Sequence, residues 1–262
     1  TKRLSSQAPF REPGSSQGYH ALTYGWLVGE VIRRVDGRSV GQYFKEEIAD
    51  PFGIDFKIGL DLEDLDRCAD ILPDPRTESM VIKLLPYMPD FMLPSQLKAL
   101  KQIIKGGDYQ VAFESFEGDQ ELFNSIEWRQ AEIPSANGHG TAESLAKLFG
   151  ILSTGCERGG NRIFSEATLN KCLQPLSEGP DTVLFGAGIK FGIGFDLGLG
   201  ITTIGQPDHP NSIFGHCGIG GCVAFGDKEN QIGYAFLCNR MHNPQELYKS
   251  TNSLTSKLFE II

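Results

Sequence analysis

The sequence predicts a fold of the α+β class, in which helices and strands occupy different parts of the chain. Helical patterns dominate residues 1–182, whereas residues 183–262 alternate small and apolar residues as strands do, before a last helical stretch. The 262 residues, 40% hydrophobic and 22% charged, suffice for a folded core. We therefore expect a mostly helical region over 1–182 and an antiparallel sheet with a C-terminal helix over 183–262, joined in one composite domain.

Turn-forming and capping residues delimit the helices of the first region. Apolar residues at three- and four-residue steps predict a first helix that ends at Gly37, a residue type that suits a left-handed C-terminal position. Ser39 and Gln42 have the spacing of a capping box, and Pro51 and Gly53 are expected to end the helix that it begins. The expected helices cover residues 21–35, 39–48, 61–72 and 96–105, and two more begin at Thr141 and Ser165.

The second region is expected to form strands over residues 191–197, 213–224 and 231–238, followed by a helix over 246–262. The inward face of that helix is expected to carry Leu247, Leu254, Leu258 and Ile261.

A hairpin turn at residues 227–230 would place Cys222 opposite Ala235 and Cys238 opposite Ile219, so these two cysteines should not face each other. None of the six cysteines forms a CxxC pair. We expect reduced thiols and an intracellular protein, either cytoplasmic or organellar.

The charge balance excludes several function classes. A net charge of −9 and a pI of about 5.1 argue against binding to nucleic acids or anionic membranes, which both reward basic residues. No apolar run approaches the roughly 18 residues that a membrane-spanning helix needs. Neither the histidines and cysteines nor the glycines at 218–221 have the spacing of a metal or phosphate site, so we expect no metal and no other cofactor.

The stretch from Gly18 to Glu30 is where a catalytic group is expected. Tyr19 lies where a loop rich in proline, glycine and serine enters the first helix, so its phenol can project into a cleft from a rigid support. A second interpretation is that Tyr19 only packs at the start of the helix.

The chain resembles a known protein family in segments that follow in the order of that family, at residues 9–14, 19–27, 32–39, 135–142 and 214–221. These segments resemble the beta-lactamase-related serine hydrolases, which include class C beta-lactamases, penicillin-binding carboxypeptidases and serine esterases.

That resemblance implies a helical region beside an antiparallel sheet flanked by helices, with the site between them. It implies hydrolysis of a small ester or amide substrate through an acyl-enzyme. Tyr19 would transfer a proton, His216 would steer a carboxylate or assist the proton relay, and Gly218 and Ile219 would bind the oxyanion on the cleft strand. Asn137 would contact substrate, or else shape its loop.

Ala21 stands where the family's Tyr-x-Asn motif has asparagine, so the resemblance favours an esterase over a beta-lactamase.

The nucleophile of that family, the serine of Ser-x-x-Lys, has no counterpart ahead of Tyr19. Two such strings begin at Ser95 and Ser144, which is close to the roughly one expected by chance from this composition. Ser144 falls inside a helix and is rejected, whereas Ser95 begins one and is kept as an alternative nucleophile.

We therefore expect the N-terminal part of the fold to be missing, and the chain alone to be inactive. It should associate with itself or with a separate N-terminal segment. The alternative is a non-catalytic, beta-lactamase-like binding or self-assembling module.

Overall fold

The computed structural model describes residues 2–72, 84–94, 97–98, 101, 105, 108–113, 121–184, 186–200, 202, 204, 212–242 and 246–262. Ser95 and most of the expected helix over 96–105 lie outside the described residues.

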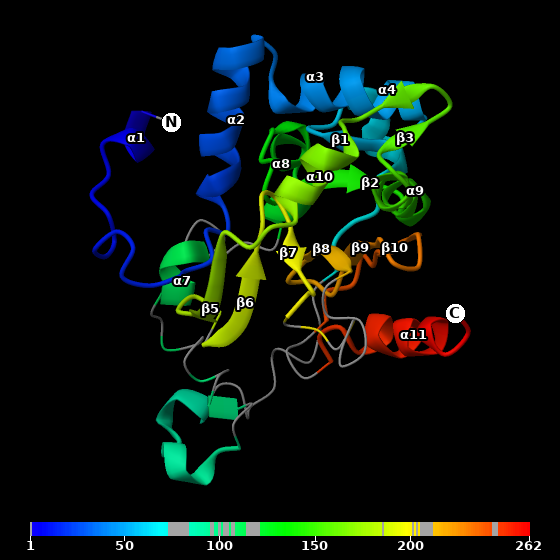
Figure 1. Cartoon of the computed structure of the whole chain (residues 1–262). Coiled ribbons are helices and arrows are strands. Elements are labelled where there is room, and N and C mark those ends of the chain that lie inside the picture. Colours follow the sequence, from blue (N-terminus) through cyan, green and yellow to red (C-terminus); the bar gives the residue numbers. More distant parts are fainter. Residues whose placement is uncertain are drawn as a thin grey trace.

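The helices lie mainly in the first two thirds of the chain, as expected (Figure 1). The α-helices are α1 (Lys2–Ser5), α2 (Thr23–Asp36), α3 (Val40–Phe44), α4 (Asp50–Phe52), α7 (Asp108–Phe113), α8 (Ile126–Gln130), α9 (Ala142–Ser153), α10 (Glu166–Cys172) and α11 (Lys249–Phe259). A π-helix, η1 (Lys45–Ala49), joins α3 to α4. The 3₁₀ helices are η2 (Leu62–Arg67), η4 (Leu85–Tyr87), η5 (Asp90–Met92) and η7 (Leu122–Asn124).

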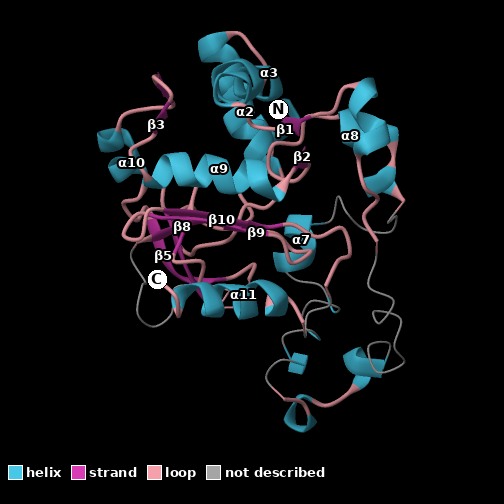
Figure 2. Ribbon diagram, turned by 90° about the vertical axis from the view of Figure 1, so that its right-hand side faces the viewer, coloured by secondary structure: helices cyan, strands magenta, loops and turns pink. Residues whose placement is uncertain are grey.

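A six-stranded antiparallel sheet forms the centre of the molecule. Its strand order is β10 (Ile232–Phe236), β9 (Val223–Asp227), β8 (Ile213–Cys217), β7 (Asp196–Leu197), β6 (Ala187–Phe191) and β5 (Ser177–Asp181). Helix α9 covers one face of this sheet and α11 the other (Figure 2). Two small ladders pair β1 (Phe56–Ile58) with β2 (Gly138–Gly140), and β3 (Glu157–Arg158) with β4 (Asn161–Arg162).

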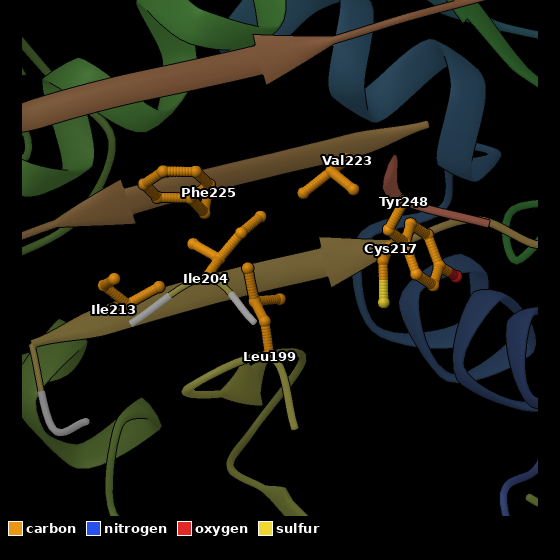
Figure 3. Packing of buried hydrophobic residues seen from close by; sticks show 7 residues of the cluster. All are labelled: Leu199, Ile204, Ile213, Cys217, Val223, Phe225 and Tyr248. Carbon is orange, nitrogen blue, oxygen red and sulfur yellow. The ribbon is translucent and has the colours of Figure 1, made fainter. Parts of the chain in front are cut away.

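The sheet buries apolar side chains on both faces, which is the main stabilising contribution to such a layered fold. The cluster of buried residues packed with Leu247 and Phe259 contains Leu199, Ile204, Ile213, Cys217, Val223, Phe225 and Tyr248 (Figure 3). A second cluster, which includes α9 side chains, contains Phe149, Leu152, Cys156, Leu169, Phe214 and Ala224.

Helix α9 approaches β10 so closely that Gly233 has no room for a side chain. A Cβ atom built there would lie 2.0 Å from the carbonyl oxygen of Ala146 and 2.1 Å from the amide nitrogen of Gly150. The helical region and the sheet are therefore in direct backbone contact at this point.

The three predicted caps form, but the capping box is incomplete, because the Gln42 side chain donates to Glu46 and not back to Ser39. Ser39, Thr141 and Ser165 each accept a hydrogen bond from a backbone N–H three residues later, at 3.2, 3.1 and 3.1 Å. Helix α2 ends at Gly37, which has a φ of 95°.

The prediction that Pro51 breaks the second helix is wrong. Pro51 follows the π-helical turn η1 without a break in the helical path, which ends only at Gly53.

The predicted sheet differs from the structure in four places. Residues 191–197 are not one strand but the end of β6, a turn and β7, and residues 213–224 are β8, a turn and the start of β9. Strand β5 lies outside the residues for which strands were expected. The turn between β9 and β10 is one residue later than predicted, because Asp227 pairs with Ile232 and Gln231 takes a left-handed φ of 57°.

This register also corrects the prediction for Cys222 and Cys238. Their sulfur atoms lie 3.9 Å apart, because both residues lie just beyond the paired ends of β9 and β10, where the regular alternation of the sheet stops.

Helices α2 and α11 bury fewer apolar side chains than expected. In α11 the buried side chains are Thr251 and Thr255, whereas Leu254 is 53% exposed and Ile261, beyond the helix, is 83% exposed. In α2 only Gly25 is buried, because a Cβ there would lie 2.5 Å from the Ser135 hydroxyl oxygen. Apolar core packing along its length therefore does not hold α2 in place.

Within the described residues, no helix is long and apolar enough to cross a membrane.

Candidate active site

Tyr19 and His216 meet in an aromatic cluster between the helical region and the sheet. The ring centroids of Tyr19 and His216 are 5.8 Å apart, and Phe191, at the end of β6, stacks on both rings at 5.9 and 6.3 Å. Phe113 of α7 lies 6.4 Å from Tyr19. The structure therefore brings together two of the residues that the sequence singled out, although they come from opposite ends of the chain.

The loop ahead of Tyr19 is fastened to the edge of the sheet. The carbonyl oxygen of Gln17 accepts a hydrogen bond from the N–H of Thr182 at 3.0 Å, and the Gln17 side chain donates to the carbonyl oxygen of Ile189 at 3.1 Å. Arg11 donates to the Thr182 hydroxyl at 2.6 Å and pairs with Asp108 of α7. These contacts help to hold Tyr19 in its place, together with the rings that pack against it.

The surroundings of Tyr19 disfavour its ionised form. Burial, together with the acidic groups Cys217, Asp196 and Asp181, raises the pKa of Tyr19 to about 12. Every charged group that shifts this pKa is acidic. A phenol that accepts protons near neutral pH needs a cation beside it, and none acts on Tyr19 within the described residues.

His216 lies on β8 and is exposed at the surface of the cluster. Its Nδ1 lies 2.9 Å from the carbonyl oxygen of Cys217, so the neutral ring donates there and leaves Nε2 as an acceptor. Desolvation of the ring lowers the pKa of His216 below its usual value, and the bond to Cys217 opposes this only in part, so the neutral ring is favoured. A neutral imidazole can accept or relay a proton, but it cannot hold a carboxylate by charge.

The turn after β8 carries Gly218 and Ile219. The N–H of Gly218 donates to the carbonyl oxygen of Cys222 at 2.7 Å, and its own carbonyl oxygen accepts from the N–H of Gly221 and from the hydroxyl of Tyr248. The Gly218 N–H is therefore already used, whereas the N–H of Ile219 has no acceptor within the described residues. Of the two expected oxyanion donors, only Ile219 has its N–H available.

Asn137 has a structural role in this molecule. It is 3% exposed, its amide oxygen accepts from the N–H of Ile133, and its amide nitrogen donates to the carbonyl oxygens of Trp128 and Ala131. All these bonds close the loop between α8 and β2. This favours the loop-shaping interpretation, and we leave Asn137 out of the site proposed below.

Asp196 is a charged group of the site that the sequence did not indicate. It lies on β7, is 3% exposed, and has one carboxylate oxygen without a hydrogen-bond partner among the described atoms. Burial raises the pKa of Asp196 to about 6, and the backbone N–H of Gly200 opposes this rise only in part. Strand alternation could have suggested that residue 196 faces inward, but nothing in the sequence pattern linked it to Tyr19.

Ser144 is not placed to attack a substrate. It is 6% exposed, and its hydroxyl accepts a hydrogen bond from the N–H of Asp55 at 2.9 Å, while Lys147 donates instead to the carbonyl oxygen of Gly53. The rejection of Ser144 as nucleophile agrees with this geometry. Among the described residues, no group of three or more His, Cys, Asp or Glu side chains could hold a metal ion.

The beta-lactamase family model matches residues 1–254 of this chain. The chain belongs to the beta-lactamase family. This beta-lactamase-family chain is 29% identical over 247 residues to the "Esterase/beta-lactamase LipL" of Mycobacterium tuberculosis, with 93% of the chain and 52% of the relative covered. It thus spans about half the length of that relative.

Two solved structures are similar to the beta-lactamase-family chain at higher identity. A family VIII carboxylesterase shares 31% identity with a TM-score of 0.72, over 92% of this chain and 57% of that one. A penicillin-binding protein homologue from Caulobacter crescentus shares 31% identity with a TM-score of 0.65, over 91% and 57%. The resemblance to beta-lactamase-related serine hydrolases and esterases and the predicted fold of that family are confirmed.

Proposed function

We propose that this chain serves in serine acyl hydrolysis, cleaving a carboxylic ester or amide through an acyl-enzyme. Tyr19 transfers the proton, the N–H of Ile219 binds the oxyanion, and His216 lines the cleft as a neutral proton acceptor. The observation that carries the proposal is the contact between the rings of Tyr19 and His216 beside the turn that exposes the Ile219 N–H.

The serine nucleophile and a lysine are proposed to come from a Ser-x-x-Lys segment that is not among these 262 residues. The electrostatics of Tyr19 support this, because the groups that shift its pKa are all acidic and a proton relay needs a cation beside the phenol. A lysine one helical turn from the serine would both accept the serine proton and lower the pKa of Tyr19.

The test compares the 262-residue chain with a longer product that includes a Ser-x-x-Lys segment. We expect the chain alone to leave nitrophenyl esters intact and to resist labelling by a fluorophosphonate, and the longer product to be active in both assays. The proposal would be contradicted if the chain alone turned over the ester, and if this turnover were lost in Ser95→Ala. The control Ser253→Ala, on the exposed side of α11, would have to keep the turnover. Ser95 would then be the nucleophile.

Ester substrates should be preferred over beta-lactams. Ala21 is 4% exposed and brings no amide group to the site, so the substrate amide contact of the Tyr-x-Asn motif is absent. Specificity constants of the active, longer product for a nitrophenyl ester and a cephalosporin decide this point, and a higher value for the cephalosporin would refute it.

A second candidate function is a self-assembling module, favoured by the outer face of α2. Tyr24, Leu27, Val28, Val31 and Val35 form this apolar α2 face and are between 39% and 84% exposed. Single exposed apolar residues are ordinary, but a run along one helix marks an association surface. Oligomers without any acyl-hydrolase activity in the longer product would favour this function over the first.

A further inference from the structure

Two thiols meet beside the turn that carries Ile219. The sulfur atoms of Cys222, just before β9, and Cys238, two residues after β10, lie 3.9 Å apart. Both residues are half-buried, so small oxidants in solution can reach them. All six cysteines are free, and the other buried or half-buried ones have no comparable sulfur contact among the described residues.

The backbone around the pair favours Cys222 as the more acidic thiol. The N–H of Cys238 donates to the sulfur of Cys222 at 3.4 Å, and the Cys238 thiol can donate to it as well. Both bonds stabilise a thiolate on Cys222 and lower its pKa. The pKa of Cys238 is raised, because its thiol proton is held in the hydrogen bond to Cys222 and because burial disfavours its thiolate. Cys222 is thus the attacking thiol and Cys238 the resolving one.

The pair also takes part in several of the contacts that shape the turn. The carbonyl oxygen of Cys222 accepts from the N–H of Gly218, and the Cys238 thiol reaches the carbonyl oxygen of Gly220 at 3.5 Å. The same Gly220 oxygen accepts from the N–H of His242. A bond between the two sulfurs would tie the end of the turn to the chain that leaves β10.

We propose that Cys222 and Cys238 are a modification site at which a small-molecule disulfide, such as glutathione disulfide, forms a reversible intramolecular disulfide. The Cys222 thiolate attacks one sulfur of the oxidant, which breaks its S–S bond and releases one glutathione thiolate that takes up a proton. The Cys238 thiol then loses its proton to water, attacks the Cys222 sulfur and releases the second glutathione. Two protein thiols are oxidised and one glutathione disulfide is reduced, independently of the proposed acyl hydrolysis.

Peptide mapping of the whole chain tests the pairing. Trypsin cleaves after Lys190, Lys228 and Arg240, so Cys222 and Cys238 fall on separate peptides, and Cys217 shares the peptide of Cys222. After equilibration in glutathione buffers of rising oxidised fraction and trapping with a maleimide, we expect a disulfide that joins residues 191–228 to 229–240. It should revert on adding dithiothreitol.

Variants assign the two roles. The linked peptide should remain in Cys217→Ala and in the distant control Cys172→Ser. It should be lost in Cys222→Ser, whereas in Cys238→Ser the reaction should stop at a glutathione adduct on Cys222.

The oxidised wild-type chain should melt at least about 5 °C above the reduced one, since the bond closes a hairpin loop in the unfolded chain.

The wild-type measurements do not depend on whether any variant folds. If both cysteines carry only maleimide or separate glutathione adducts at the most oxidising ratio, or if Cys217→Ala abolishes the link, the proposal is overturned.

Discussion

Replacing Asp196 by asparagine should stabilise the protein at neutral pH. The carboxylate of Asp196 is almost fully buried, and one of its oxygens lacks a hydrogen-bond partner among the described atoms, so its charge is poorly compensated. Asparagine has nearly the same shape, keeps an oxygen that can accept from the N–H of Gly200, and carries no charge.

The size of the effect follows from the raised pKa. The shift of Asp196 from 3.8 to about 6 corresponds to a cost of about 3 kcal/mol for the ionised group in the folded state. This cost is absent below pH 3.8, where the carboxyl group is protonated in the folded and unfolded states, and it is complete above about pH 6. The gain in Asp196→Asn should therefore grow as the pH rises between these values.

Urea unfolding at pH 4 and at pH 7.5 measures this gain. We expect the free energy of unfolding of Asp196→Asn to exceed that of the wild type by about 2–3 kcal/mol at pH 7.5 and by less than about 1 kcal/mol at pH 4. Asp227→Asn is the matched control, because Asp227 is also fully buried but accepts hydrogen bonds from Glu229 and Asn230, so its replacement should destabilise. Equal or lower stability of Asp196→Asn at pH 7.5 would refute the reasoning.

Three further substitutions test other parts of the structure. In the longer, active product, Tyr19→Phe should reduce turnover of a nitrophenyl ester by about a hundredfold, with little change in melting temperature. Unchanged turnover would mean that Tyr19 only packs at the start of the helix. Gly233→Ala should lower the free energy of unfolding by about 2 kcal/mol or more in a urea titration, because the new methyl group meets the backbone of α9. In the control Gly188→Ala the new methyl group has nothing within 4 Å, so the free energy of unfolding should change far less. If the apolar α2 face mediates association, Val31→Glu should shift the mass measured by light scattering toward that of the monomer. Leu176 is an exposed leucine outside this face, so Leu176→Glu should not shift the mass. Equal effects of the two substitutions would exclude the α2 face as the association surface.

Local signals in the sequence predicted three helix starts correctly, whereas the end expected at Pro51 and the helix expected over 61–72 were wrong, because the latter is the shorter 3₁₀ helix Leu62–Arg67. Ser39, Thr141 and Ser165 cap helices because a hydroxyl can satisfy a free backbone N–H within a few residues, which is independent of the rest of the fold. The strand boundaries depend on partners that are remote in sequence. The glycine-rich alternation from 191 to 197 is equally compatible with one strand or with two short strands around a turn, and only the pairing of Phe191 with Asp196 decides.

The candidate site was predictable only in part. Tyr19 and His216 could be selected because they belong to motifs of a known family, and the structure brings their rings together. Whether a backbone N–H is free is decided by the turn around it, which is why Gly218 and Ile219 differ. Asp196 and the contact between Cys222 and Cys238 depend on the exact register, which composition and periodicity do not specify.

The attachment of the N-terminal loop to β5 and β6 has a consequence for the order of folding. Gln17 bonds to Thr182 and Ile189, so the loop that positions Tyr19 closes over most of the chain. Contacts between such distant residues form slowly, because the entropy of closing a long loop is lost before the contact repays it. The sheet edge must therefore exist before Tyr19 can settle, and in refolding the ring signals of Tyr19 should become native among the last.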